Sequence, residues 1–197
     1  MRYYKTKKNI GLFGGTFDPV HFGHLRISNR ALSILELDEV WWIVSLENPL
    51  RMNKSSDYDE RVSNAKKIVS NPKVHVSELE KNLNTVFTID VLTYLKKNCP
   101  KTNFVWIMGA DNLKSFHFWK EWKKIFSQVP IAIFDRPFYS LNVQKSRGLG
   151  FFKKNRLPAS KASSLKYSVP PSWIFLTGWA NYISSTQVKI KQKNNEK

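Results

Sequence analysis

The sequence predicts an α/β protein with one Rossmann-like, doubly wound, mostly parallel sheet and helices on both faces. Two observations predict this fold class. Apolar runs of three to five residues alternate with segments whose apolar residues recur at helical spacing. The runs are continuously apolar, as are strands of parallel sheets that are buried on both faces. Alternation of such strands with helices is typical of a doubly wound sheet.

The expected elements follow from this alternation. Strands are expected at residues 10–13, 40–44, 74–76, 104–108, 131–134 and 173–176, and helices at 25–35, 58–69, 88–97, 119–126 and 186–193. Asp57 is expected to cap the second helix. Residues 138–172 lack clean periodicity and are expected to form a loop-rich excursion, so residues 1–197 are predicted to form a single domain.

The composition favours a globular protein that binds anions. Hydrophobic residues make up 42% of the 197 residues, and no apolar run approaches the length of a membrane span. The formal net charge of +17 is spread along the chain, which favours a solvated basic surface that attracts nucleotides. A basic nucleic-acid-binding protein is the alternative. The single cysteine, Cys99, is consistent with a cytoplasmic location.

Residues 14–24, which read GGTFDPVHFGH, are the most informative segment. A strand, a glycine turn and a helix N-terminus in succession present backbone N–H groups to a phosphate. His21 and His24 are two of only four histidines and lie at the helix entrance, and Gly23 between them allows a ligand to approach the backbone. Helix capping or packing is the alternative role for this pair. No cluster of Cys or His elsewhere completes a metal site.

This segment resembles the His/Thr-x-Gly-His signature of a nucleotidyltransferase superfamily. Residues 183–189, ISSTQVK, resemble its Ile-Ser-Ser-Thr-x-x-Arg motif. Taken with the segments between them, the chain most resembles the bacterial nicotinate-nucleotide adenylyltransferases, from Ile10 to Lys189. The resemblance implies that ATP and nicotinate mononucleotide are joined to give nicotinate adenine dinucleotide and pyrophosphate, in NAD biosynthesis. Enzymes of the same superfamily that act on nicotinamide mononucleotide or pantetheine phosphate, or that transfer a cytidylyl group, are the alternatives.

The resemblance implies that ATP is bound by both ends of the chain. His21 and His24 match the motif histidines that contact the phosphates, so these two are expected to be catalytic. The other residues implied for ATP are Gly14, Gly15, Thr16, Phe17, Gly109, Asp111, Ile183, Ser185, Thr186 and Lys189. Asp111 and the hydroxyls at 185–186 are also candidates for helix capping. Lys189 stands where the family has Arg, which keeps the charge and loses the planar fork.

The residues implied for the mononucleotide are Thr88, Trp119 and Arg136. Residues 87–90 resemble the Tyr-Thr-Ile-Asp segment of the family, with Phe87 in place of Tyr. The resemblance gives the N–H of Thr88 to the nicotinate carboxylate, and capping alone is the alternative. Trp119 is expected to stack on the pyridine ring and Trp122 to belong to the core. Residues 48–51 resemble a loop over the active site, with Arg51 in place of Lys.

The chemistry requires no nucleophile from the protein, because the attacking phosphate is already anionic. It requires alignment of two polyanions and neutralisation of charge at phosphorus. Mg²⁺ is expected to arrive with ATP. Asp18 precedes Pro19 and fits a turn as well as a metal site, so no protein ligand to the metal is assigned. Ligands of doubly wound sheets bind beyond the carboxyl ends of the strands, which predicts residues 14–15, 45–49 and 109–111 on one rim.

Overall fold

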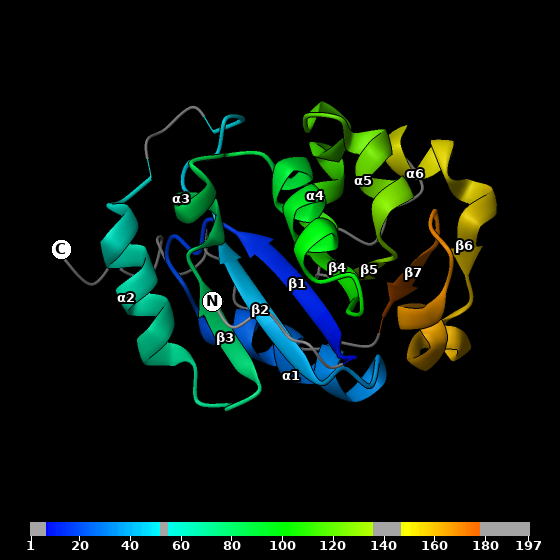
Figure 1. Cartoon of the computed structure of the whole chain (residues 1–197), viewed down its shortest axis with the longest axis horizontal. Coiled ribbons are helices and arrows are strands. Elements are labelled where there is room, and N and C mark those ends of the chain that lie inside the picture. The colour runs from blue at the N-terminus through cyan, green and yellow to red at the C-terminus, as the bar shows by residue number, and fades with distance from the viewer. Residues whose placement is uncertain (1–6, 52–54, 136–146, 178–197) are drawn as a thin grey trace, which may run out of the picture.

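A computed structural model describes residues 7–51, 55–135 and 147–177 of the chain (Figure 1). Its centre is a seven-stranded sheet in the order β3-β2-β1-β4-β5-β7-β6, in which all neighbouring strands are parallel. The strands are β1 (Asn9–Gly15), β2 (Glu39–Val44), β3 (Val74–Ser77), β4 (Asn103–Gly109), β5 (Ile131–Phe134), β6 (Arg156–Leu157) and β7 (Trp173–Leu176).

Helices cover both faces of the sheet. The α-helices are α1 (Phe22–Ile34), α2 (Tyr58–Ile68), α3 (Leu79–Leu83), α4 (Thr88–Asn98), α5 (Trp122–Gln128) and α6 (Arg147–Phe151). The 3-10 helices are η1 (Ala110–Lys114), η2 (Phe116–Phe118), η4 (Lys153–Asn155) and η5 (Ala159–Tyr167). One buried cluster joins the sheet to α3, α4 and α5, and a second joins it to α1, α2 and η5. Figure 1 shows α4 and α5 in front of the sheet and α1 behind it.

The order of the strands creates a switch point between β1 and β4. The chain runs from β1 outward to β2 and β3, and then returns to place β4 on the other side of β1. The connections that leave the carboxyl ends of β1 and β4 therefore diverge to opposite faces. A crevice at such a point is where doubly wound sheets bind their ligands.

The predicted fold class and the six predicted strands are confirmed. Two runs, at 131–134 and 173–176, have the predicted bounds, and the other four strands are longer by one to three residues. Asp57 is the N-cap of α2 and accepts hydrogen bonds from the N–H groups of Asp59 and Glu60. The expected helix at 186–193 lies outside the described residues, and the single domain stays a prediction.

The fold differs from the prediction in several parts, among them α3, η1 and η2, which the sequence did not predict. The helix expected at 119–126 begins only at Trp122, because Glu121 takes a left-handed conformation with φ of 54° and Trp119 is extended. The helix expected to start at Leu25 starts at Phe22, with His21 as its N-cap. The described part of the loop-rich excursion contains α6, η4 and η5, and also β6, which pairs with β7 and which the sequence did not predict.

Candidate active site

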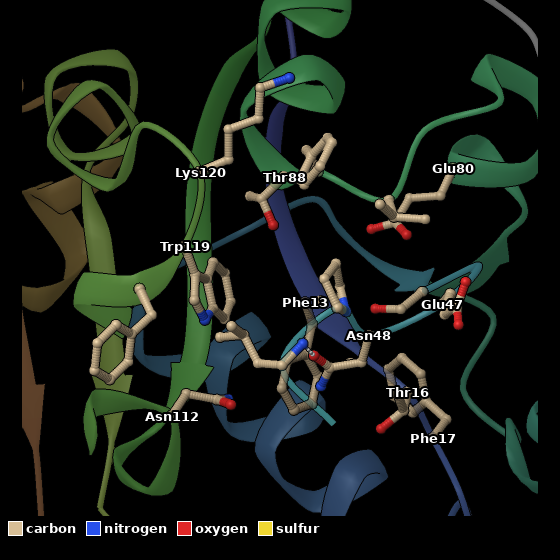
Figure 2. A pocket seen from close by; sticks show the side chains of 18 of the residues that line it. Phe13, Thr16, Phe17, Glu47, Asn48, Glu80, Thr88, Asn112, Trp119 and Lys120 are labelled. Carbon is tan, nitrogen blue, oxygen red and sulfur yellow. Dashed lines mark hydrogen bonds between the residues drawn. The ribbon is translucent and has the colours of Figure 1, made fainter. Parts of the chain in front are cut away.

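A pocket opens at the carboxyl ends of β1, β2 and β4, beside the switch point (Figure 2). β1, β4, the loop after β2 and the start of α4 contribute to its wall. The lining residues are 13–17 and His24, then Ser45 and 47–50, then Glu80 and 86–88, and finally Trp106, Asp111, Asn112 and 118–120. All three segments predicted to share one rim therefore contribute residues to this pocket.

The expected glycine turn lies one step later than predicted, because Gly14 and Gly15 are the last two residues of β1 and pair with β2. These two glycines and the turn at Thr16 and Phe17 together form the glycine turn, whose start is shaped by packing against β4. A Cβ atom on Gly14 would lie 2.5 Å from Cη2 of Trp106, whose side chain is buried. A side chain at this position would therefore push the indole out of the pocket wall. Phe17 closes the turn with φ of 50°, a conformation that costs energy for a residue other than glycine. Its ring stacks on Trp42 with a centroid separation of 4.9 Å, which holds the turn in place.

The two histidines of the motif contact each other but differ in their relation to the pocket. Their ring centroids are 3.8 Å apart. His24 lines the pocket, whereas His21 is buried next to it and does not line it. The Nδ1 atom of His24 accepts a hydrogen bond of 3.2 Å from the N–H of His21. The proton of the neutral His24 ring must then be on Nε2, which makes Nε2 a donor.

The contact between His21 and His24 also caps α1, so the alternative role in helix capping is confirmed for this pair. His24 is the third residue of α1 and reaches back to the N-cap residue, in the pattern of a capping box. Capping does not account for the position of His24 in the pocket wall. The contact instead fixes the ring orientation at the N-terminus of α1, where the helix dipole favours an anion.

Arg61 joins the two loops that form one side of the pocket. Its guanidinium donates to the carbonyl of Thr16 at 2.7 Å, and to those of Ser45 at 2.9 Å and Leu46 at 3.1 Å. The side chain belongs to α2 and is 2% exposed. Burial lowers the pKa of Arg61 from its ordinary value, although the group stays charged.

Asp18 and Arg51 form a second link between the same loops. Arg51 Nη1 lies 2.8 Å from Asp18 Oδ2, and the hydroxyl of Ser56 donates to Asp18 Oδ1 at 3.1 Å. Arg51 thus anchors the loop at 48–51, in which Asn48 Oδ1 accepts from the N–H of Leu50. Asp18 supports these loops as an ion-pair partner.

Glu80 is a buried carboxyl group in the pocket wall. It is 4% exposed and accepts a hydrogen bond of 2.9 Å from the N–H of Leu46. Burial raises the pKa of Glu80 to about 7, against the opposing effects of the Leu46 hydrogen bond and the nearby Arg61. Figure 2 shows its carboxyl group directed toward the interior of the pocket.

The opposite side of the pocket is built from the start of α4 and the segment after η2. Thr88 is the first residue of α4, and Phe87, its N-cap, provides no side-chain cap. Trp119 is edge-on to Trp106, with centroids 6.3 Å apart at 87°. Trp122 does not line the pocket; it is partly buried and packs against Phe116 at the edge of the core, rather than within it as predicted.

The structure brings together most of the predicted site residues that it describes. Gly14, Gly15, Thr16, Phe17, His24, Thr88, Asp111 and Trp119 line one pocket. His21 adjoins it, and Gly109 is the N-cap of η1 without lining the pocket. Arg136, Ile183, Ser185, Thr186 and Lys189 lie outside the described residues.

Sequence reasoning missed Arg61, Glu80, Asn112 and Lys120. Arg61 and Glu80 are charged residues within amphipathic segments, and their partners are backbone atoms far along the chain. No local pattern marks such residues. Lys120 directly follows Trp119, which was predicted to contact the pyridine ring, and this neighbouring position could have indicated that Lys120 lies at the pocket.

The chain belongs to the cytidylyltransferase-like family, whose model matches residues 12–191. Among its curated relatives, one from Ruegeria sp. (strain TM1040) is 39% identical over 180 residues, covering 91% of this chain and 95% of the relative. One from Bradyrhizobium sp. (strain BTAi1) is 42% identical over 184 residues, covering 91% and 94%. Both are named "Probable nicotinate-nucleotide adenylyltransferase".

A solved structure supports the fold independently. Nicotinic acid mononucleotide adenylyltransferase from Plasmodium falciparum, complexed with NaAD, superposes with a TM-score of 0.72. The match covers 93% of this chain and 83% of the other at 19% identity, which establishes likeness of fold. Within the described residues, no helix is long and apolar enough to cross a membrane, and no three His, Cys, Asp or Glu side chains are grouped as metal ligands.

Proposed function

We propose that this chain transfers the adenylyl group of ATP to nicotinate mononucleotide, forming nicotinate adenine dinucleotide and pyrophosphate in the cytoplasm. One observation carries the proposal: a single pocket has a glycine turn with His24 on one side and Thr88 with Trp119 on the other. These two sides suit the two substrates of such a transfer. The names of the curated relatives support the same reaction.

The glycine turn and α1 receive the phosphates of ATP. Gly15 and Thr16 line the pocket at the end of β1, where backbone N–H groups and the start of α1 favour an anion. His24 adds a donor from Nε2, since its Nδ1 accepts the N–H of His21. His21 acts through His24, because its N–H holds Nδ1 of that ring.

The other side receives the mononucleotide. The indole of Trp119 offers an aromatic face to a flat, electron-poor pyridine ring. Thr88 and the start of α4 offer N–H groups and a hydroxyl to the ring carboxylate. With the ring held there, the phosphate of the mononucleotide is directed toward the ATP on the glycine turn.

The reaction is a displacement at the α-phosphorus of ATP. An oxygen of the mononucleotide phosphate forms a bond to that phosphorus, the bond to the bridging oxygen of the β-phosphate breaks, and pyrophosphate leaves with the bonding electrons. The protein aligns the reactants and stabilises the charge that develops. Mg²⁺ bound to ATP would neutralise phosphate charge, as it does in other phosphoryl-transfer sites. Residues 183–189 are proposed to hold the β- and γ-phosphates, and Arg136 to contact the mononucleotide.

The proposal is tested by a substrate panel. Pyrophosphate release is measured with nicotinate mononucleotide, nicotinamide mononucleotide or phosphopantetheine, each with ATP or CTP and Mg²⁺. The expected result is release that requires ATP and is fastest with nicotinate mononucleotide. Release that is fastest with phosphopantetheine, or that follows CTP, would overturn the proposal. Salt-dependent binding of DNA or RNA without any release would favour a nucleic-acid-binding protein instead.

A further inference from the structure

An ion pair that the transfer chemistry does not require lies at the ring side of the pocket. Lys120 lines the pocket, and its Nζ atom lies 3.6 Å from Oδ2 of Asp90. The same Nζ lies 4.2 Å from the centre of the Phe87 ring. Figure 2 shows the Lys120 side chain extending past Thr88, at the end of the pocket opposite Asn112, with its ammonium group directed away from the interior of the pocket.

Asp90 is held in place by the turn that begins α4. It is the third residue of that helix, two residues after Thr88. The hydroxyl of Thr85 donates to Asp90 Oδ2 at 2.8 Å and accepts from the N–H of Phe87 at 3.2 Å. A fixed carboxylate of the protein therefore lies one helical turn or less from the proposed site of the substrate carboxylate.

This arrangement creates an electrostatic conflict that Lys120 resolves. The charge of Asp90 suits the helix N-terminus but repels a second carboxylate bound there. The ammonium group of Lys120 pairs with Asp90 and so offsets the negative charge that Asp90 places at the start of α4. The Lys120 and Asp90 side chains are 46% and 43% exposed, so solvent weakens both effects without removing them.

We propose that Lys120 is a specificity-determining residue that makes the pocket select nicotinate mononucleotide over nicotinamide mononucleotide. This inference rests on the proposed function. The two mononucleotides have nearly the same shape and differ by one negative charge on the ring substituent. Shape therefore discriminates poorly between them, whereas a cation that offsets the repulsion from Asp90 stabilises the acid and leaves the neutral amide nearly unaffected.

The test compares kcat/KM for the two mononucleotides in four proteins: wild type, Lys120→Met, Asp90→Asn and the double variant. Methionine keeps the length of the side chain and removes its charge. We expect Lys120→Met to lower the acid-to-amide ratio by about fivefold or more, mainly through a higher KM for the acid. Asp90→Asn in the Lys120→Met background should restore part of the ratio, because the uncompensated carboxylate is gone.

Lys123→Met is the matched control. Lys123 lies on α5 over the rings of Trp122 and Phe151 and does not line the pocket, so its loss should leave the ratio unchanged. Thermal unfolding of each variant shows whether the fold is retained. Loss of a merely structural lysine would lower kcat/KM equally for both mononucleotides.

Two results would overturn the inference. The first is an unchanged ratio in Lys120→Met, or an equal loss with acid and amide. The second is a wild-type protein that prefers the amide. A wild type that turns over neither mononucleotide would remove the proposed function and the inference together, whereas a strong acid preference that survives in Lys120→Met removes the inference alone.

Discussion

Arg61 donates to the carbonyl oxygen of Thr16 at 2.7 Å across 45 positions of sequence, and this contact fixes the glycine turn to the neighbouring loop. The same guanidinium holds the carbonyls of Ser45 and Leu46 after β2. The phosphate side of the pocket therefore depends on a residue that does not line it.

Removal of Arg61 should disturb both stability and ATP binding. Arg61→Met leaves several buried carbonyls without their donor, and we expect a loss of about 2–4 kcal/mol in the free energy of unfolding. Arg61→Lys should recover only part of the lost free energy of unfolding, because one ammonium group cannot reach all of these carbonyls. Urea unfolding and the KM for ATP measure the two effects. Arg26→Met, at an exposed position of α1, is the control and should behave as wild type.

His24→Ala should lower kcat by on the order of a hundredfold or more, as loss of a transition-state donor does in other enzymes. His24→Asn keeps a polar group near the cap and should lose comparable activity with a smaller effect on stability. His75→Ala, a half-exposed histidine on β3 outside the pocket, is the control. Wild-type turnover in a folded His24→Ala protein would show that the ring does not serve the reaction.

Trp119→Ala should raise the KM for the mononucleotide and leave the KM for ATP nearly unchanged, because the indole is proposed to contact the pyridine ring and no part of ATP. Trp119→Phe should retain much of the affinity, since it keeps an aromatic face. Trp122→Ala removes a core contact and should lower the melting temperature without raising this KM. An unchanged KM in Trp119→Ala would move the ring contact to another residue.

Glu80 should make stability depend on pH in a defined window. Burial raises the pKa of Glu80 to about 7, so the folded protein binds a proton that the unfolded chain releases near its ordinary pKa. The stabilising effect of the protonated form is complete below about pH 4.5 and is lost as the pH rises toward 7, by on the order of 3 kcal/mol.

Glu80→Gln tests this directly, because glutamine can still accept the hydrogen bond from Leu46 and does not titrate. Urea unfolding at several pH values between 4.5 and 8 should show that the difference in stability between variant and wild type grows with pH in favour of the variant. A difference that stays constant over this range would mean that Glu80 titrates normally.

The sequence predicted correctly those elements whose conformation depends on neighbouring residues in the chain. Every residue of the runs at 131–134 and 173–176 is apolar. Such a short, fully apolar run is typical of a strand buried on both faces, and both strands are buried throughout. The prediction that a helix starts at Trp119 was wrong. The spacing of Trp119, Trp122 and Phe126 fits one continuous helix as well as it fits the observed start at Trp122. Glu121 has a left-handed conformation, which interrupts the helix before Trp122. The spacing of apolar residues does not indicate such a conformation.

The candidate site shows the same division. The glycine turn and His24 come from one continuous segment, and that segment fixes their relation to each other. Glu80 and Arg61 act on backbone atoms of other loops, so their roles exist only once β1, β2 and α2 are assembled. Those contacts depend on tertiary structure, which residue type and spacing do not encode locally.

Transfer of an isotopic label tests the central claim most directly. ATP labelled at its α-phosphorus is incubated with the protein, Mg²⁺ and nicotinate mononucleotide, and the products are separated. The account predicts that the label appears in nicotinate adenine dinucleotide, in equal amount to the unlabelled pyrophosphate released, and only when both substrates are present. Label that remains in ATP, or that appears in AMP without dinucleotide, would contradict it.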